Sequence, residues 1–124
     1  MRAITERSAI DLARAIRGRE LTATEVVGAH IDLHRRLRRR LNALAEERFE
    51  QALEEAAAAD RTIAAASTPS ELPPLLGVPF TVKESIAVQG MPQCAGLLAR
   101  REYCAECNAC TVQRLVGAGR SCCA

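Results

Sequence analysis

The stretch that decides the fold of this 124-residue chain is Leu75-Leu76-Gly77-Val78-Pro79-Phe80-Thr81-Val82-Lys83-Glu84-Ser85. Gly and Pro punctuate its start, a short apolar run follows, and a lysine stands just after that run. Val78, Phe80 and Val82 alternate with Pro79 and Thr81, and β-branched residues are frequent. This alternation predicts a strand over residues 79–83. Most of the remaining chain is expected to pack around this segment or to connect to it.

Helical periodicity dominates the chain before this strand. Ser8 is suited to cap a first helix, and Gly18 to close it. Thr22-Ala23-Thr24-Glu25 fits a capping box, in which Thr22 caps a second helix and Glu25 reaches back to it. The apolar stripes predict three helices, over residues 5–18, 22–40 and 48–66.

The connecting segments carry weaker patterns. Residues 41–45 are expected to form a short strand or a bend. After the predicted strand, residues 109–118 are expected to form a helix that Gly119 closes. The residues from 121 to 124 would begin another strand.

Prolines divide the chain into two parts. Three prolines fall between residues 67 and 74, which indicates a loop. We therefore expect an N-terminal helical part over residues 1–66, a Pro-rich loop over 67–74, and the start of an α/β core over 75–124.

Composition limits the function classes. The chain is long enough for one small domain. It has no Trp, two Phe and one Tyr, so its core is expected to be thin, and its net charge of +2 does not indicate a nucleic-acid partner. No apolar run is long enough to span a membrane, and the charged N-terminus does not resemble a signal peptide. The expected location is the cytoplasm, where cysteines are thiols or metal ligands.

Lys83 is the residue with the strongest chemical case. A lysine at the end of a buried strand is costly unless it is paired or deprotonated. Burial favours the neutral amine, which accepts protons or acts as a nucleophile. The neighbouring Glu84 offers the alternative, an ordinary ion pair with Lys83.

The segment around Lys83 resembles the catalytic-lysine segment of the amidase signature family, with Gly77-Val78-Pro79 and Val82-Lys83 as its most specific part. The resemblance covers roughly residues 8–119 in the family's order, and it favours the fatty-acid-amide-hydrolase-like branch. Further similar segments are Leu12-Ala13-Arg14-Ala15-Ile16, Leu41-Asn42-Ala43, Phe49-Glu50-Gln51-Ala52-Leu53, Gln89-Gly90-Met91-Pro92, Ala95-Gly96-Leu97 and Gly117-Ala118-Gly119.

The resemblance implies an α/β fold in which N-terminal helices precede the first strands and helix of a mixed sheet. It implies hydrolysis of a small-molecule carboxylic amide, without a cofactor, through a Ser–cis-Ser–Lys arrangement in which Lys83 is the base. The two serines lie in a later Gly/Ser-rich segment of the family, and neither Ser85 nor Ser121 is in a matching position. The chain is therefore expected to be a truncated homologue with an incomplete core, inactive alone. The alternative is a non-enzymatic fragment that associates with a full-length homologue.

The cysteines support a different hypothesis. Cys104, Cys107 and Cys110 follow C-x₂-C-x₂-C spacing, which can hold zinc or an iron–sulfur cluster. Free thiols and disulfides are the alternatives for these residues and for Cys94, Cys122 and Cys123.

Two histidines also have a spacing that metals use. His30 and His34 stand one helical turn apart, but no further ligand accompanies them. We expect His30 to be a partly buried, hydrogen-bonded packing residue.

Overall fold

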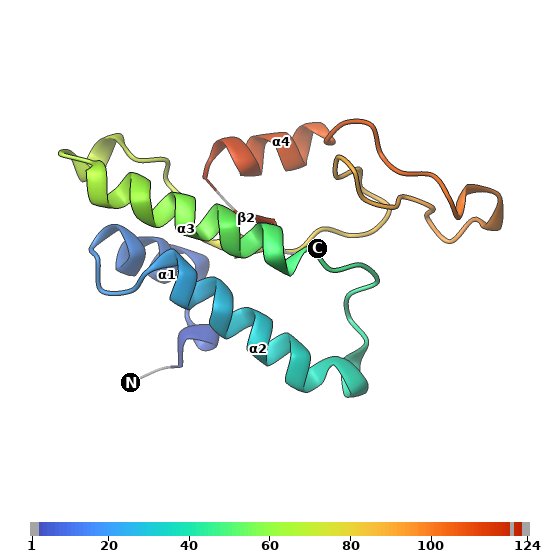
Figure 1. The fold of residues 1–124 in the computed structure, drawn as a ribbon, viewed down its shortest axis with the longest axis horizontal. Coiled ribbons are helices and arrows are strands. Elements are labelled where there is room, and N and C mark those ends of the chain that lie inside the picture. The colour runs from blue at the N-terminus through green and yellow to red at the C-terminus, as the bar shows by residue number, and fades with distance from the viewer. Residues whose placement is uncertain (1–2, 120, 123–124) are drawn as a thin grey trace.

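Helices form most of the structure, a computed structural model that describes residues 3–119 and 121–122 (Figure 1). The described residues form helices α1 (Ala9–Arg17), α2 (Ala23–Leu41), α3 (Phe49–Ala65) and α4 (Cys110–Gly117), strands β1 (Pro79–Phe80) and β2 (Ser121–Cys122), and 3₁₀ turns at Ile4–Glu6, Pro69–Glu71 and Leu98–Arg100. None of these helices combines the length and apolar character needed to cross a bilayer.

The N-terminal caps of α1 and α2 explain why the first two predicted helices begin near Ser8 and Thr22. The Ser8 hydroxyl accepts the Asp11 N–H at 3.1 Å. The predicted capping box is confirmed, because Thr22 Oγ1 accepts the Glu25 N–H at 3.0 Å and Glu25 Oε2 accepts the Thr22 N–H at 2.8 Å. The Thr22 N–H lowers the pKa of the Glu25 carboxyl. These bonds satisfy N–H groups that a helix cannot pair internally.

The backbone at the end of α1 differs from the prediction, and the end of α2 decides between the bend and the strand that the sequence left open. Gly18 has a φ of −75°, and the left-handed residue after α1 is Arg19, with a φ of 60°. The Arg19 guanidinium donates to the Ile63 carbonyl at 3.0 Å, so a contact with α3 helps hold this backbone conformation. After α2, Asn42 is left-handed and residues 42–48 form bends and coil, so the predicted bend is confirmed and the alternative strand is wrong.

Asp60 of α3 completes the N-terminal cap of α2. Its carboxylate accepts the Ala23 N–H at 2.6 Å, the Thr24 N–H at 3.1 Å and the Thr24 hydroxyl at 2.7 Å. The two helices are thus joined by an anion placed at the positive end of the α2 dipole. Sequence periodicity placed Asp60 on an outer face and gave no sign of this role.

We expect Asp60→Ala to lower the free energy of unfolding by about 1–2 kcal/mol, since it removes the cap shared by two backbone N–H groups. Urea denaturation followed by circular dichroism measures the loss. Glu54→Ala is the matched control, because Glu54 is exposed on the same helix. Equal losses in the two variants would contradict the role given to Asp60.

The main core lies between α1, α2 and α3. Helices α2 and α3 make the most extensive contact between elements and lie side by side in Figure 1. Small side chains on α3 let the two helices approach closely. The buried residues of this core are Leu12, Ile16, Ala23, Val26, Val27, Ile31, Phe49, Ala52, Ala56, Ala59, Ile63 and Val78.

The first strand is shorter than the sequence predicts. The prediction was a strand over residues 79–83, whereas β1 ends at Phe80. Phe80 pairs with Cys122 of β2 in parallel register, and residues 81–83 have no ladder partner among the described residues. Phe80, Val112 and Cys122 form a second, smaller core beneath α4. Residues 123 and 124 of the predicted final strand lie outside the described residues.

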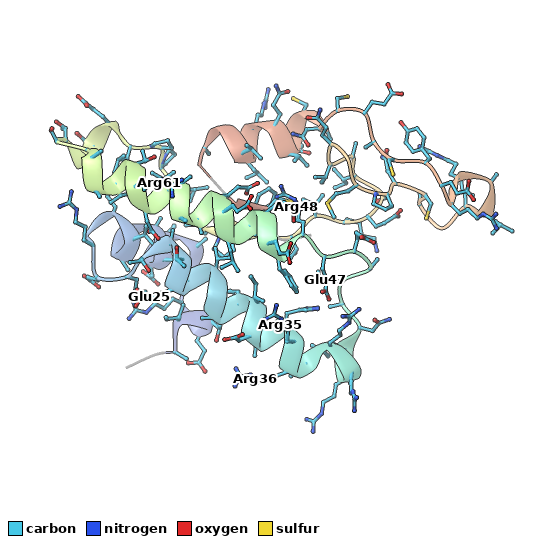
Figure 2. The ribbon with its side chains drawn as sticks, in the orientation of Figure 1. Glu25, Arg35, Arg36, Glu47, Arg48 and Arg61 are labelled. Carbon is cyan, nitrogen blue, oxygen red and sulfur yellow. The ribbon has the colours of Figure 1, made fainter. Side chains whose placement is uncertain are left out.

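Two side chains at the start of α3 fasten β2 to the helices. Arg48 Nη1 donates to the Cys122 carbonyl at 2.6 Å, and Glu55 Oε2 accepts the Cys122 N–H at 3.3 Å. Arg48 Nη2 also pairs with Glu55 Oε1 at 2.8 Å, and Figure 2 shows Arg48 at the side of α3 that faces β2. Burial lowers the pKa of Arg48, but Glu55 outweighs this effect and raises it. The pair therefore covers backbone groups of β2 with side chains.

Candidate active site

Lys83 lies three residues beyond β1, at the start of a long irregular segment that extends away from the helices (Figure 1). It is the only lysine in the chain, beside sixteen arginines. Lys83 is exposed, so the expectation that it lies buried at the end of the strand is wrong for this structure. The reason is the early end of β1, which leaves residues 81–83 outside the sheet core.

A cavity of about 150 Å³ adjoins Lys83. One wall comes from the connection between α2 and α3, and the other comes from the segment that follows β1. Most of its lining is apolar, with Lys83, Glu84 and Glu46 as the charged members. The remaining lining residues are Ala43, Leu44, Ala45, Val82, Ile86, Val88, Met91 and Pro92.

Glu84 does not pair with Lys83 in the way the sequence allowed. Its carboxylate accepts the Cys94 N–H through Oε1 and the Ala95 N–H through both oxygens, at 3.2 and 3.0 Å. Within the described part of the chain, no carboxylate lies within ion-pair distance of Lys83. We call these hydrogen bonds from Cys94 and Ala95 to Glu84 the Glu84 clamp, and sequence reasoning missed it.

The clamp also changes the pKa of the Glu84 carboxyl. The Cys94 N–H, then the Ala95 N–H and the Lys83 charge, hold the pKa of the Glu84 carboxyl below its ordinary value of 4.5. These hydrogen bonds stabilise the ionised form of the Glu84 carboxyl. Their contribution to folding stability is therefore present above pH 4.5 and is lost as the pH falls through the lowered pKa.

We therefore expect the Cys94 and Ala95 amide resonances to shift together during an acid titration, with a midpoint below pH 4.5. ¹⁵N–¹H NMR spectra recorded along the titration measure these shifts. Glu84→Gln should abolish that titration. Glu106→Gln is the control, because Glu106 is an exposed carboxylate of the same irregular segment. A midpoint at or above 4.5 would refute the clamp.

Further hydrogen bonds order the segment between β1 and α4. Asn108 Oδ1 accepts the Gln89 N–H at 2.8 Å, and Ala109 donates to the Ala87 carbonyl at 2.9 Å. Pro92 and Cys104 face each other in an isolated antiparallel bridge. These contacts close the long irregular segment on itself, so the residues beside Lys83 are held by its far end.

Among the described residues, the cysteines are not arranged as the alternative hypothesis of a metal module requires. Cys104, Cys107 and Cys110 are exposed free thiols. Cys104 sits in the bridge with Pro92, whereas Cys110 begins α4, so no single compact turn brings the sulfurs together. Among the described residues no three His, Cys, Asp or Glu side chains are placed to hold a metal ion. Cys94 is also a free thiol, Cys122 is buried beside β1, and Cys123 lies outside the described residues.

The two histidines have packing contacts. His30 Nδ1 lies 2.8 Å from the Val26 carbonyl and the residue is half-buried, as expected. His34 Nε2 lies 3.2 Å from Glu47 Oε1, and its ring packs edge-on against Phe49 at 5.5 Å. Glu47 lies just before α3, so this contact helps fix the connection that lines the cavity beside Lys83.

A family model described as Amidase matches residues 25–123, which include the cavity and Lys83. The chain belongs to the amidase family. It is 44% identical over 116 residues to fatty-acid amide hydrolase 2-A of Danio rerio, a match that covers 90% of this chain and 22% of that protein.

Solved amidase structures show the same fold. The peptide amidase of Stenotrophomonas maltophilia superposes with a TM-score of 0.81 at 31% identity, over 95% of this chain and 24% of that one. A fatty acid amide hydrolase superposes with a TM-score of 0.89 over 97% of this chain and 21% of that one, at 22% identity. The chain thus spans about a fifth to a quarter of the length of these relatives, and its helices and short strands have the arrangement that amidase-signature enzymes use there.

Proposed function

We propose that this chain is the lysine-bearing part of an amidase that hydrolyses carboxylic amides through a Ser–cis-Ser–Lys arrangement. Lys83 is the base in this proposal. It takes the proton of the nucleophilic serine through the bridging serine and returns a proton to the leaving amine. Both serines lie on a segment that residues 1–124 do not include.

The observation that carries the proposal is the family match around the only lysine of the chain. Sixteen other basic positions are arginine, whose guanidinium does not lose its proton in proteins. A general base must be able to release its proton during the reaction, which a lysine amine can do and an arginine guanidinium cannot. The position beside a mostly apolar cavity gives the amine a place where substrate and serines could meet it.

The proposal includes the organisation predicted from the sequence. Residues 1–66 form the helical part, 67–74 the loop, and 75–124 the start of an α/β core with a mixed sheet. The parallel pair of β1 and β2, with α4 between them in sequence, supports an α/β core. The free thiols of Cys94, Cys104, Cys107 and Cys110 support a reducing compartment such as the cytoplasm.

The test joins residues 1–119 of this chain to the remaining C-terminal part of the zebrafish fatty-acid amide hydrolase 2-A. The chimera should react with a serine-directed fluorophosphonate and hydrolyse a long-chain fatty-acid amide, whereas residues 1–124 alone should do neither. A chimera that folds but is inactive would contradict the amidase proposal. Labelling and turnover by the isolated chain would overturn the assignment of the serines to another segment.

A full-length homologue is the partner that we propose for the chain. Large apolar side chains stay exposed on the segment after β1 and on α4, including Leu98 at 80% and Val116 at 46%. Such side chains favour association when they lie together on a surface. A pull-down with the full-length zebrafish relative tests this, and no enrichment over an unrelated protein would refute it.

A further inference from the structure

A tight turn begins at Lys83, and the segment around residues 93–95 holds it from outside. The Ile86 N–H donates to the Lys83 carbonyl at 2.8 Å, which closes the turn. Gln93 Nε2 donates to the Ser85 carbonyl at 3.0 Å, and Glu84 accepts from the next two residues, Cys94 and Ala95. Each inner residue of the turn is therefore bonded to the same short segment.

The segment is shaped to receive an anion. Ala95 and Gly96 both have left-handed backbones, with φ of 50° and 75°, and the N–H groups of Cys94 and Ala95 converge on one carboxylate. Successive N–H groups in such turns form anion-binding concavities. A left-handed alanine is unfavourable by itself, so the bonds to Glu84 help stabilise the conformation.

This arrangement has a consequence for the lysine. Glu84 is the nearest carboxylate to Lys83 in sequence, and an ion pair between them would favour the charged amine. The backbone N–H groups occupy the Glu84 oxygens instead. The Lys83 amine is thus free of a carboxylate partner among the described residues, while its backbone is fixed at the rim of the cavity.

We propose that Glu84 is a positioning residue for Lys83: by accepting the backbone N–H groups of Cys94 and Ala95, it locks the turn that presents the lysine to the cavity. This inference rests on the proposed role of Lys83 as the base. Glu84 touches neither substrate nor serine in it, and acts only through the lysine and the 93–95 segment.

The test uses residues 1–124 labelled with ¹³C-lysine, in which the side-chain signals come from Lys83 alone. We expect cross-relaxation between the Lys83 methylenes and the protons of Ile86 and Met91, which line the same cavity. Glu84→Ala should reduce these cross-peaks at least about twofold and narrow the lysine signals. Glu46→Gln is the matched control, because Glu46 is an exposed carboxylate of the same cavity.

A merely structural clamp would give a different result. The proposal is overturned if Glu84→Ala shifts the Cys94 and Ala95 amides but leaves the Lys83 signals unchanged, or if Glu46→Gln changes them equally. Should Glu84→Ala fail to fold, acid titration of the unsubstituted chain replaces it. The Lys83 signals should then shift with the midpoint of the Cys94 amide, and a different midpoint counts against positioning. Hydrolysis is not measured, so a failure here leaves the amidase proposal intact.

Discussion

Replacing Lys83 by arginine should lower amide hydrolysis by the chimera between about a hundredfold and ten-thousandfold, the usual contribution of a general base. Arginine keeps the positive charge and much of the length of lysine, but it does not release its proton. Lys83→Met removes the charge as well and keeps a similar apolar stem. If proton transfer is the role of Lys83, the two variants should be impaired to a similar extent in kcat, measured under saturating substrate.

The comparison between these two variants separates proton transfer from charge. Lys83→Arg with nearly full activity, beside an inactive Lys83→Met, would show that position 83 supplies only a positive charge. Lys83 is exposed, so neither substitution should change the thermal unfolding midpoint by more than a few degrees. Arg101→Met is the control for a lost surface cation, because Arg101 is exposed and pairs only with the exposed Glu102.

The helices could be predicted because their signals are local. The bonds of the α2 capping box join residues three apart, and its apolar stripe repeats every three or four residues. The strand was harder because its length depends on a distant partner. Phe80 pairs with Cys122, forty-two residues later. The sequence of residues 79–83 carries no information about that partner.

The candidate site also has one part that local sequence indicates and one part that depends on distant residues. Lys83 could be proposed as a site residue from the family resemblance, because the residues that carry the resemblance are contiguous. The hydrogen bonds of the Glu84 carboxylate could not be predicted, since its partners are backbone N–H groups ten and eleven residues away. Backbone donors have no residue type to recognise, and the adjacent Lys83 offered a simpler partner. The exposure of Lys83 was mispredicted for the related reason that burial of a strand end depends on neighbouring elements.

Gly77 is the glycine whose replacement should destabilise the fold most clearly. It is buried with a φ of 79°, and its N–H donates to the Gly119 carbonyl at 2.8 Å, which joins the start of the decisive stretch to the end of α4. A Cβ at this position would lie 2.5 Å from the Cβ of Ala23 and 3.6 Å from Cδ1 of Ile16. Ala23 is fully buried in α2, so neither side can move away without opening the core.

We expect Gly77→Ala to lower the free energy of unfolding by about 2–5 kcal/mol. The left-handed backbone accounts for about 1–2 kcal/mol of this loss, and overpacking against Ala23 for about 1–3 kcal/mol. Gly28→Ala should act in the opposite direction and stabilise α2 by about 1 kcal/mol, because nothing lies within 4 Å of its Cβ position and alanine favours helices. Urea denaturation of the three chains measures both effects. A Gly77→Ala chain as stable as the unsubstituted one would show that the 75–79 segment does not pack against α2. That result would also contradict the placement of Lys83 at the cavity.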